Sequence, residues 1–200
     1  MTRRTPTGAA VLQPTVTKAI TEAVLDELAE NGYARLSMEA VAKRAGVGKS
    51  ALYRRWSSKQ EMAISVISEF GAEQVTVPDT GSLRGDLRAA LGTLMKWLTH
   101  PRFSRIMADL VAETARNAKL GEAVETLVGM PKRERVAAMF HRAIARGELP
   151  ADTDLELALD LLAAPLYWRL VVRSAAADPT YIDDLTDALL RSFTRRPHDR

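Results

Sequence analysis

Basic side chains alternate with very small ones in the stretch RAGVGKSALYRRW, residues 44–56. Positive side chains bind phosphate groups, and small side chains let a helix approach another molecule closely. The combination predicts contact with a nucleic-acid backbone rather than catalysis. A run of charge is also typical of a solvated helix face, so the flanking residues decide between the two interpretations.

The flanks predict two short helices joined by a tight turn. Ser37 can cap a helix that ends at Gly46, and a second short helix follows at about 48–54. This is a helix-turn-helix arrangement, in which Val47 and Leu52 face inward and lock the two helices together. The outward face of the second helix then carries Gly48, Lys49, Ser50, Tyr53 and Arg54.

The residue types on and beside this face suit double-stranded DNA. The small residues Gly48, Ser50 and Ala51 would let the helix enter a major groove about 12 Å wide. The Tyr53 hydroxyl can donate to a phosphate. The cations that would neutralise phosphates are Lys49, Arg54, Arg55 and Lys59.

Structural interpretations compete with these roles. Trp56 fits a core aromatic better than a DNA contact, whereas Tyr53 fits the exposed face better than the core. Lys49 and Arg55 are also compatible with a merely solvated surface.

The charge of the chain is lopsided. The net charge is +3, yet residues 1–60 hold ten Lys and Arg against five Asp and Glu, which gives +5, and the remainder is slightly acidic. A basic first third indicates an anionic partner at one end. Nucleic acid is the first candidate, and an anionic membrane surface is the second.

Several other functions find no support. The chain has no cysteine, and its three histidines, His100, His141 and His198, lack metal-ligand spacing. There is no phosphate-binding loop and no nucleophile-base pattern, and the longest apolar run, 161–168, is too short to span a bilayer. We expect no metal, no cofactor, no membrane span and a cytoplasmic location. A helical enzyme or a lipid-binding module is the alternative of another class.

Nearly every periodic segment predicts a helix, which indicates an all-α protein of about nine helices. The first helix, 14–31, closes at Asn31-Gly32, and Ser57 with Gln60 forms a capping box for a helix over 57–74. Residues 75–81 predict a linker. The expected domains are 12–72 and 73–200. The later helices are expected at 82–100, at 101–117, at 120–146 with a break at Pro131, from 152 or 154 to 173 with a kink at Pro165, and at 178–193 with Asp178 as cap and Pro179 in the first turn.

The segment SMEAVAKRAGVGKSALYRRWSSKQEM, residues 37–62, resembles the DNA-binding motif of the TetR family of bacterial transcriptional regulators. The resemblance implies an all-helical dimer that binds operator DNA through its first three helices and a small effector through the remaining ones. It implies phosphate contacts at Ser37 and Lys59, base contacts at Lys49, Ser50 and Ala51, and backbone contacts at Tyr53, Arg54 and Arg55. Gly48 stands where such proteins often have Ser or Thr, so a hydroxyl contact is missing there.

The C-terminal part predicts an effector pocket and a dimer interface. The dimer is expected to form through 154–173 and 178–193, with a face made of Leu155, Leu159, Leu162, Leu166, Leu185 and Leu189. The apolar candidates for the pocket are Trp97, Phe103, Met107, Leu110, Phe140, Leu162, Tyr167 and Trp168, and the polar candidates are Arg105, Asp109, Glu113 and His141. These residues also suit an ordinary core, so the alternative is a regulator without an effector.

The helix over 57–74 is expected to link the two parts mechanically. The favoured interpretation is a repressor that a hydrophobic small molecule releases from a palindromic operator.

Overall fold

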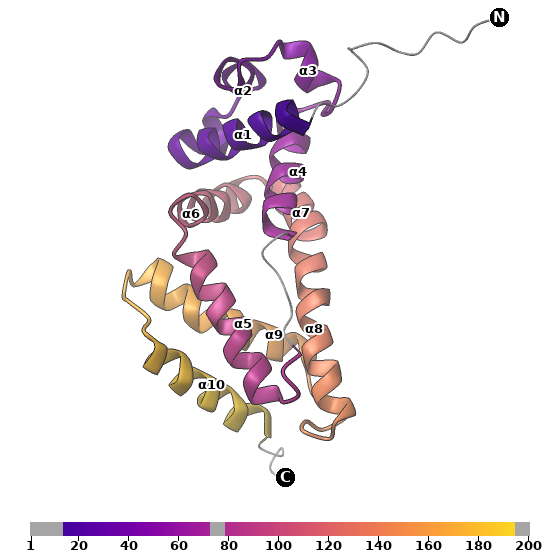
Figure 1. Cartoon of the computed structure of the whole chain (residues 1–200), viewed down its shortest axis with the longest axis vertical. Coiled ribbons are helices and arrows are strands. Elements are labelled where there is room, and N and C mark those ends of the chain that lie inside the picture. Colours follow the sequence, from indigo (N-terminus) through magenta and orange to yellow (C-terminus); the bar gives the residue numbers. More distant parts are fainter. Residues whose placement is uncertain (1–13, 73–78, 195–200) are drawn as a thin grey trace, which may run out of the picture.

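The computed structural model describes residues 14–72 and 79–194, and every regular element in those ranges is helical. Figure 1 shows α1 (Pro14–Arg35), α2 (Met38–Ala45) and α3 (Lys49–Tyr53) gathered at one end. From there α4 (Lys59–Ala72) runs toward the rest of the molecule. The all-α prediction is confirmed.

The helix-turn-helix forms where its caps predict it. The Ser37 Oγ accepts a hydrogen bond from the Ala40 N–H at 3.1 Å, and Gly46 ends α2 in the left-handed conformation, with φ 66°. Gly48 is the N-cap of α3 and offers no side-chain acceptor. Leu52 is fully buried beneath α3, and Val47 packs partly buried against the same core, so both lock the helices as expected.

The first helix departs from its predicted end. Helical structure resumes after Gly32, whose φ of 74° breaks the helix, and continues to Arg35. The Asp109 carboxylate, from α6 (Pro101–Arg116), accepts a hydrogen bond from the Tyr33 N–H at 2.7 Å. Asp109 therefore satisfies a backbone donor at the break in α1, a role that was not predicted for it.

The cap of α4 lies one residue later than predicted. Ser58, not Ser57, accepts from the Glu61 N–H through its hydroxyl, and the Glu61 carboxylate accepts from the Ser57 N–H and hydroxyl. Ser58 therefore caps α4, and the Glu61 side chain reaches back to Ser57, one residue before the position that a reciprocal capping box would use. The predicted linker lies mostly outside the described residues.

The C-terminal part consists of α5 (Leu83–Leu98), α6, α7 (Ala118–Val124), α8 (Met130–Ala145), α9 (Leu155–Tyr167) and α10 (Pro179–Thr194). Two π-helical segments, Glu125–Gly129 and Trp168–Val172, interrupt the runs at α7–α8 and after α9. Each lies within a few residues of a proline, Pro131 or Pro165, at which an interruption of the helix was predicted. Proline has no backbone N–H, so the regular α-helical hydrogen bond is missing there. Asp178 caps α10 as predicted, accepting from the Tyr181 N–H at 2.8 Å.

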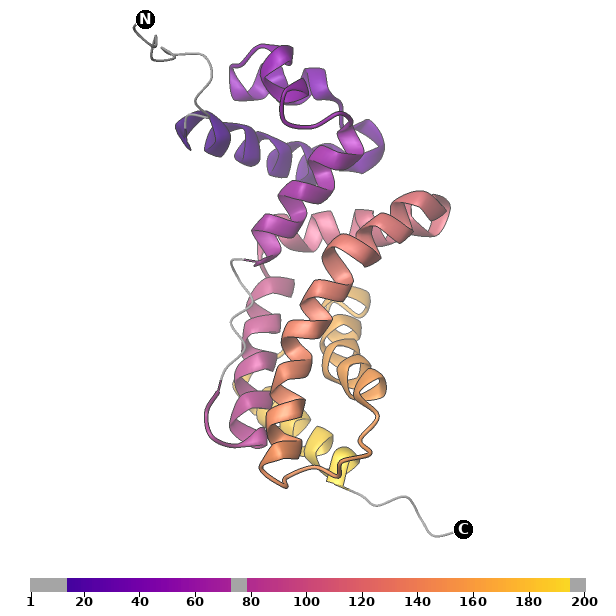
Figure 2. The same cartoon turned by 90° about the vertical axis from the view of Figure 1, so that its right-hand side faces the viewer.

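The described residues form two apolar cores, and the membership of these cores crosses the expected domain boundary. The first core joins α1–α4 with Ile106, Leu110, Leu120 and Val128. The second joins α5 with α8, α9 and α10. Figure 2 shows α8 running beside α5 in this second group. Helix α6 thus contributes to the N-terminal core from one face and to the C-terminal core, through Phe103, from another.

The predicted dimer face is wrong in its residues. Leu159, Leu162, Leu166 and Leu189 are all buried within the single chain, where α9 and α10 pack on α5. Leu155 and Leu185 are half-buried against the same core. The periodic leucines of α9 and α10 face the chain's own core because α5 offers the nearest apolar surface.

Candidate nucleic-acid interface

The outward face of α3 is open to solvent. Tyr53 is 56% exposed as a residue, and the Lys49 side chain is 55% exposed. Gly48, Ser50 and Arg54 are also exposed, and Ala51 is half-buried. The side chains predicted to face DNA are therefore accessible, while Leu52 fixes the helix from below.

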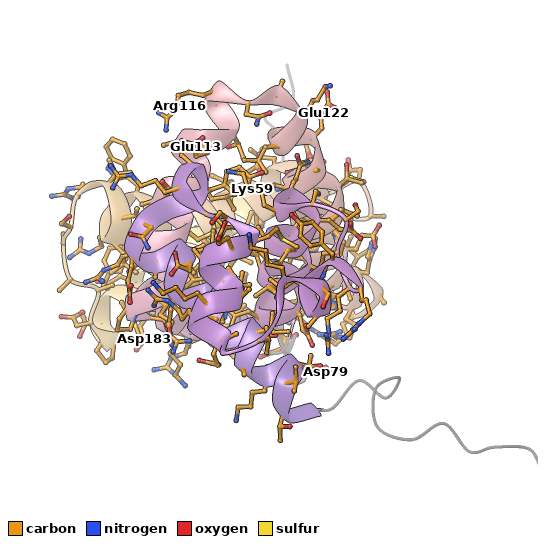
Figure 3. The ribbon with its side chains drawn as sticks, turned by 90° about the horizontal axis from the view of Figure 1, so that it is seen from above. Lys59, Asp79, Glu113, Arg116, Glu122 and Asp183 are labelled. Atoms are coloured by element: carbon orange, nitrogen blue, oxygen red, sulfur yellow. The ribbon has the colours of Figure 1, made fainter. Side chains whose placement is uncertain are left out.

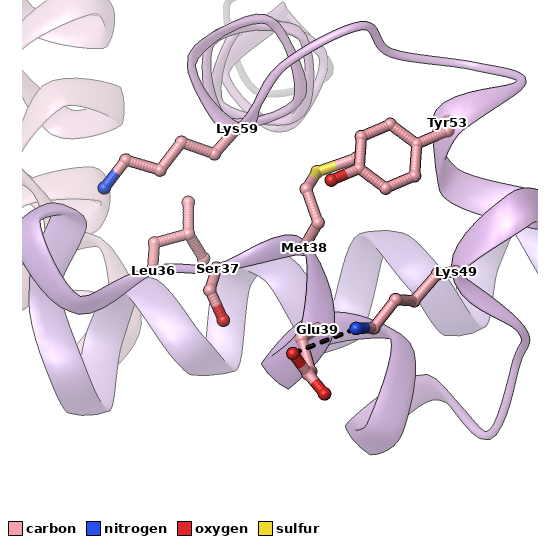
Figure 4. A pocket seen from close by; sticks show the side chains of 7 residues that line it. All are labelled: Leu36, Ser37, Met38, Glu39, Lys49, Tyr53 and Lys59. Atoms are coloured by element: carbon pink, nitrogen blue, oxygen red, sulfur yellow. Dashed lines mark ion pairs between the residues drawn. The ribbon is translucent and has the colours of Figure 1, made fainter.

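A shallow hollow of about 360 Å³ separates α3 from the start of α2 and α4. Its lining is Leu36, Ser37, Met38, Glu39, Lys49, Tyr53 and Lys59. Figure 4 shows the Tyr53 ring beside Met38 and the Lys59 side chain on the far side of the hollow. Four predicted contact residues, Ser37, Lys49, Tyr53 and Lys59, thus surround one depression.

Lys49 pairs with a carboxylate of the preceding helix. Its ammonium lies 3.0 Å from the Glu39 carboxylate, and both side chains are exposed (Figure 4). An exposed pair of this kind is worth at most about 1 kcal/mol, so a phosphate can compete with Glu39 for the ammonium.

Lys59 is held by the end of α1. Its ammonium donates to the carbonyls of Tyr33 and Ala34, each at 3.2 Å, and lies 4.8 Å from the centre of the Tyr33 ring. Viewed from the α1–α3 end, Lys59 lies among the N-terminal helices, whereas Glu113, Arg116 and Glu122 lie beyond them at one edge (Figure 3). An ammonium has three donors, so one is left for another acceptor.

Two arginines of the sequence stretch differ in their freedom. Arg55 is half-buried and donates to the Ala51 carbonyl at 2.9 Å and to the Thr17 hydroxyl at 3.3 Å. Arg54 is exposed, and no carboxylate within the described ranges pairs with it. Arg54 is the more available of the two for a phosphate.

Arg44 has a role that the sequence reasoning missed. Its guanidinium lies against three carboxylates of α1, with contacts of 3.9 Å to Asp26, 2.8 Å to Glu27 and 2.5 Å to Glu30. The hydrogen bond from Arg44 lowers the pKa of Glu30, and the hydrogen bond to Glu30 raises the pKa of Arg44. This basic residue fastens α2 to α1 and is not free for DNA. The acidic residues at positions 26, 27 and 30 were the sequence signal from which these ion pairs could have been predicted.

Comparison with known proteins decides the family. Residues 20–66 match the model described as bacterial regulatory proteins, tetR family, and residues 77–189 match that of the tetracyclin repressor-like C-terminal domain. The chain belongs to the TetR family. It is a DNA-binding transcriptional regulator, and the family comprises regulators rather than enzymes, as expected.

Individual relatives agree with this assignment. The chain is 32% identical to the DNA-binding transcriptional repressor TetR of Mycobacteroides abscessus over 88% of its own length and 93% of the relative. It is 29% identical to the uncharacterized HTH-type transcriptional regulator YdeS of Bacillus subtilis over 84% of each chain. The crystal structure of the TetR family transcription regulator SCO0332 superposes with a TM-score of 0.72, at 29% identity, over 88% of this chain and 97% of that one.

The pocket residues predicted for this TetR-family regulator are only partly brought together. Trp97 and Phe103 are in contact, with ring centres 3.8 Å apart, and Met107, Tyr167 and the buried Phe140 belong to the same C-terminal core. Leu110 lies instead in the N-terminal core, because its face of α6 packs on α1. Trp168 is 59% exposed on the outer side of the second π-helical segment, so it does not line that core.

Neither a membrane span nor a metal cluster is found in the described part of the regulator. Between residues 14 and 72 and between 79 and 194, no helix combines the length and apolar character needed to cross a bilayer. Over the same ranges, no group of three or more His, Asp or Glu side chains is arranged to hold a metal ion.

Proposed function

We propose that this regulator is a repressor that reads a palindromic operator with α3. The observation that supports this most is the exposed face of α3, which sets Lys49 and Tyr53 around a hollow with Ser37 while Leu52 anchors the helix. The proposed contacts are Ser37, Gly48, Lys49, Ser50, Ala51, Tyr53, Arg54, Arg55 and Lys59. Arg55 and Lys59 keep unused donors, so each can add a phosphate to its internal bonds.

The test is a footprint on the DNA upstream of the regulator's own gene, followed by titration of that site. We expect the variant Lys49→Ala with Tyr53→Ala to weaken specific binding about 100-fold or more, since each lost contact costs about 1–3 kcal/mol. Circular dichroism should be unchanged, because both side chains are exposed. Normal binding by the double variant would contradict the proposal.

We further propose a homodimer that pairs through the outer face of α9 and the π-helical segment after it. Leu157, Trp168 and Val172 are each at least half exposed, and Leu161 and Ala164 lie between them at helical spacing. A row of exposed large apolar side chains marks an association surface. Two-fold pairing would set the two α3 helices in successive major grooves, roughly 34 Å apart.

The proposed control by a small hydrophobic effector runs through α6 as well as α4. The Arg102 guanidinium of α6 lies 2.6 Å from Glu22 and 3.1 Å from Asp26 of α1, and Asp109 binds the Tyr33 N–H. A shift of α6 would therefore move α1 and the helices packed on it. An effector that releases nearly all of the bound dimer must prefer the released state by about 10⁴, or roughly 5.5 kcal/mol.

The competing function is a regulator whose C-terminal core is filled by its own side chains. It predicts that no small molecule weakens the footprint.

We also propose that residues 12–72 form the DNA-binding domain and residues 73–200 the effector domain. The proposed location is the bacterial cytoplasm, since that is where an operator is found.

A further inference from the structure

An ammonium group lies against aromatic rings at the junction of α4, α5, α6 and α8. The Lys132 Nζ of α8 lies 4.1 Å from the centre of the Trp97 ring of α5 and 5.9 Å from that of Phe103 of α6. Phe70 of α4 stacks on Trp97 with ring centres 6.4 Å apart. His100 meets Phe70 edge-on at 5.7 Å. We call these five residues the aromatic cage.

Lys132 has no acidic partner in this cage. No carboxylate of residues 14–72 or 79–194 lies within ion-pair distance of its ammonium, although many other cations in those ranges are paired. Burial lowers the pKa of Lys132 to about 8, with a smaller contribution from the positive charge of Arg135. At neutral pH the ammonium is still protonated, so the cage contains a positive charge without a counter-ion.

Trp97 adds a second donor without an acceptor. Its indole Nε1 is buried, and no acceptor within the described ranges hydrogen-bonds to it. Buried donors are nearly always satisfied, and an unsatisfied one costs about 1–3 kcal/mol. Within the described ranges, one contact between α5 and α8 therefore combines an ammonium that lacks a carboxylate partner with a buried indole N–H that lacks an acceptor.

We propose that Lys132 and the Trp97 indole N–H anchor the anionic head, such as a carboxylate, of an otherwise apolar effector. A carboxylate is an acceptor only, so it can take a charge-assisted hydrogen bond from the ammonium and a second bond from the indole. The rings of the cage suit the apolar part of the same molecule. This inference rests on the proposed function and assigns a chemical class to its effector.

The position of the cage couples a molecule bound there to the DNA-binding helices. Phe103 of the cage lies in the first turn of α6, and its neighbour Arg102 pairs with Glu22 and Asp26 of α1. A molecule that inserts beside Phe103 displaces the turn that carries Arg102. The anionic effector thus acts on α1 through a single helical turn.

The test compares carboxylates with their neutral amides on the full chain at pH 7. The probes are octanoate, decanoate and 2-naphthoate, each paired with its amide, and binding is measured by calorimetry. We expect at least one carboxylate to bind about tenfold more tightly than its amide, the value of one charge-assisted hydrogen bond. The Trp97 indole proton, assigned by Trp97→Phe, should shift downfield when that carboxylate binds.

Matched variants locate the preference. Lys132→Met should remove the difference between carboxylate and amide, and Lys132→Arg should retain most of it. Lys96→Met is the control, because Lys96 is exposed on the same helix as Trp97. The inference is overturned if no carboxylate binds, if amides bind equally well, or if the preference survives in Lys132→Met.

The two proposals fail separately in this design. If the ligand-free chain protects a specific operator but does not discriminate carboxylate from amide, the anion anchor is wrong and the regulator stands. If the carboxylate preference depends on Lys132 but no operator is protected, the anchor stands and the proposed repression is wrong.

Discussion

At the residue scale, the basic side chains near the recognition helix divide by their partners. Arg44 is held by three acidic residues of α1 and Lys59 by two carbonyls, whereas Arg54 is exposed and Lys49 has one weak partner. Position in the sequence did not distinguish them, since all four lie within sixteen residues, 44–59. The difference matters for DNA binding because only a lightly held cation can move to a phosphate at little cost.

Glu39 should oppose the movement of the Lys49 ammonium to a phosphate. We expect Glu39→Gln to increase operator affinity about threefold to tenfold at low salt, because it removes both the partner of Lys49 and a negative charge beside the phosphates. Fluorescence anisotropy measures the change, and the gain should shrink as salt rises. Glu122→Gln, an exposed position on α7, is the matched control. Equal affinity of Glu39→Gln and the wild type would show that the pair does not restrain Lys49.

Lys132 should lower the stability of the folded chain at neutral pH. Its folded pKa of about 8 lies below the ordinary value of 10.5, so between these two values the unfolded chain binds more protons. The free energy of unfolding contributed by Lys132 therefore rises with pH across that window and is lowest below pH 8. We expect Lys132→Met to be more stable than the wild type by roughly 1–3 kcal/mol at pH 7.

The same comparison at higher pH provides the check. Urea unfolding at pH 7 and pH 9.5 should show the advantage of Lys132→Met decreasing as the wild-type lysine loses its proton. An advantage that is constant with pH would rule out burial of the charge as its cause.

At the scale of elements, the contact between α1 and α6 depends on a glycine. Gly32 has a φ of 74°, and a Cβ at this position would lie 2.6 Å from the Asp109 Oδ1 that belongs to the carboxylate capping Tyr33. A side chain here meets both backbone strain and a clash. Glycine is therefore what allows α6 to approach the end of α1.

We expect Gly32→Ala to lower the free energy of unfolding by about 2 kcal/mol or more, through the positive φ and the displaced Asp109. Gly92→Ala is the control, since Gly92 lies inside α5 and a Cβ there meets nothing within 4 Å. That control should gain about 0.5–1 kcal/mol. Thermal unfolding of both variants distinguishes strain at Gly32 from a general effect of alanine.

At the scale of the whole molecule, the exposed apolar row on α9 and the π-helical segment after it should determine the oligomeric state. We expect Trp168→Asp to yield a monomer at micromolar concentration, because an unpaired carboxylate at the centre of an apolar interface costs several kcal/mol. The fold should survive, since Trp168 is 59% exposed in the single chain. Light scattering measures the mass, and operator affinity should fall with it.

The control for this variant is Val111→Asp, at an exposed apolar position on α6, 46% accessible and away from the row. It should leave the mass unchanged. A wild-type chain that is itself monomeric under these conditions would contradict the proposed dimer, and a dimeric Trp168→Asp variant would contradict its location.

What the sequence determined by itself is local. Ser37, Gly46, Asp178 and Pro179 act at the helix ends where they were expected, because a cap bonds to backbone groups only two to four residues away. The helix-turn-helix follows from such signals together with the inward Leu52. The family resemblance over 37–62 rests on the same contiguous residues.

What only the tertiary structure decided concerns contacts between distant segments. Helical periodicity shows that Leu159 and Leu189 share an apolar face, but it does not show that α5, rather than a second chain, covers that face. The pairing of Lys132 with Trp97 joins residues on α8 and α5, and that of Asp109 with Tyr33 joins α6 and α1. Such contacts depend on how whole helices pack, and the free energy of packing is a property of all the faces together.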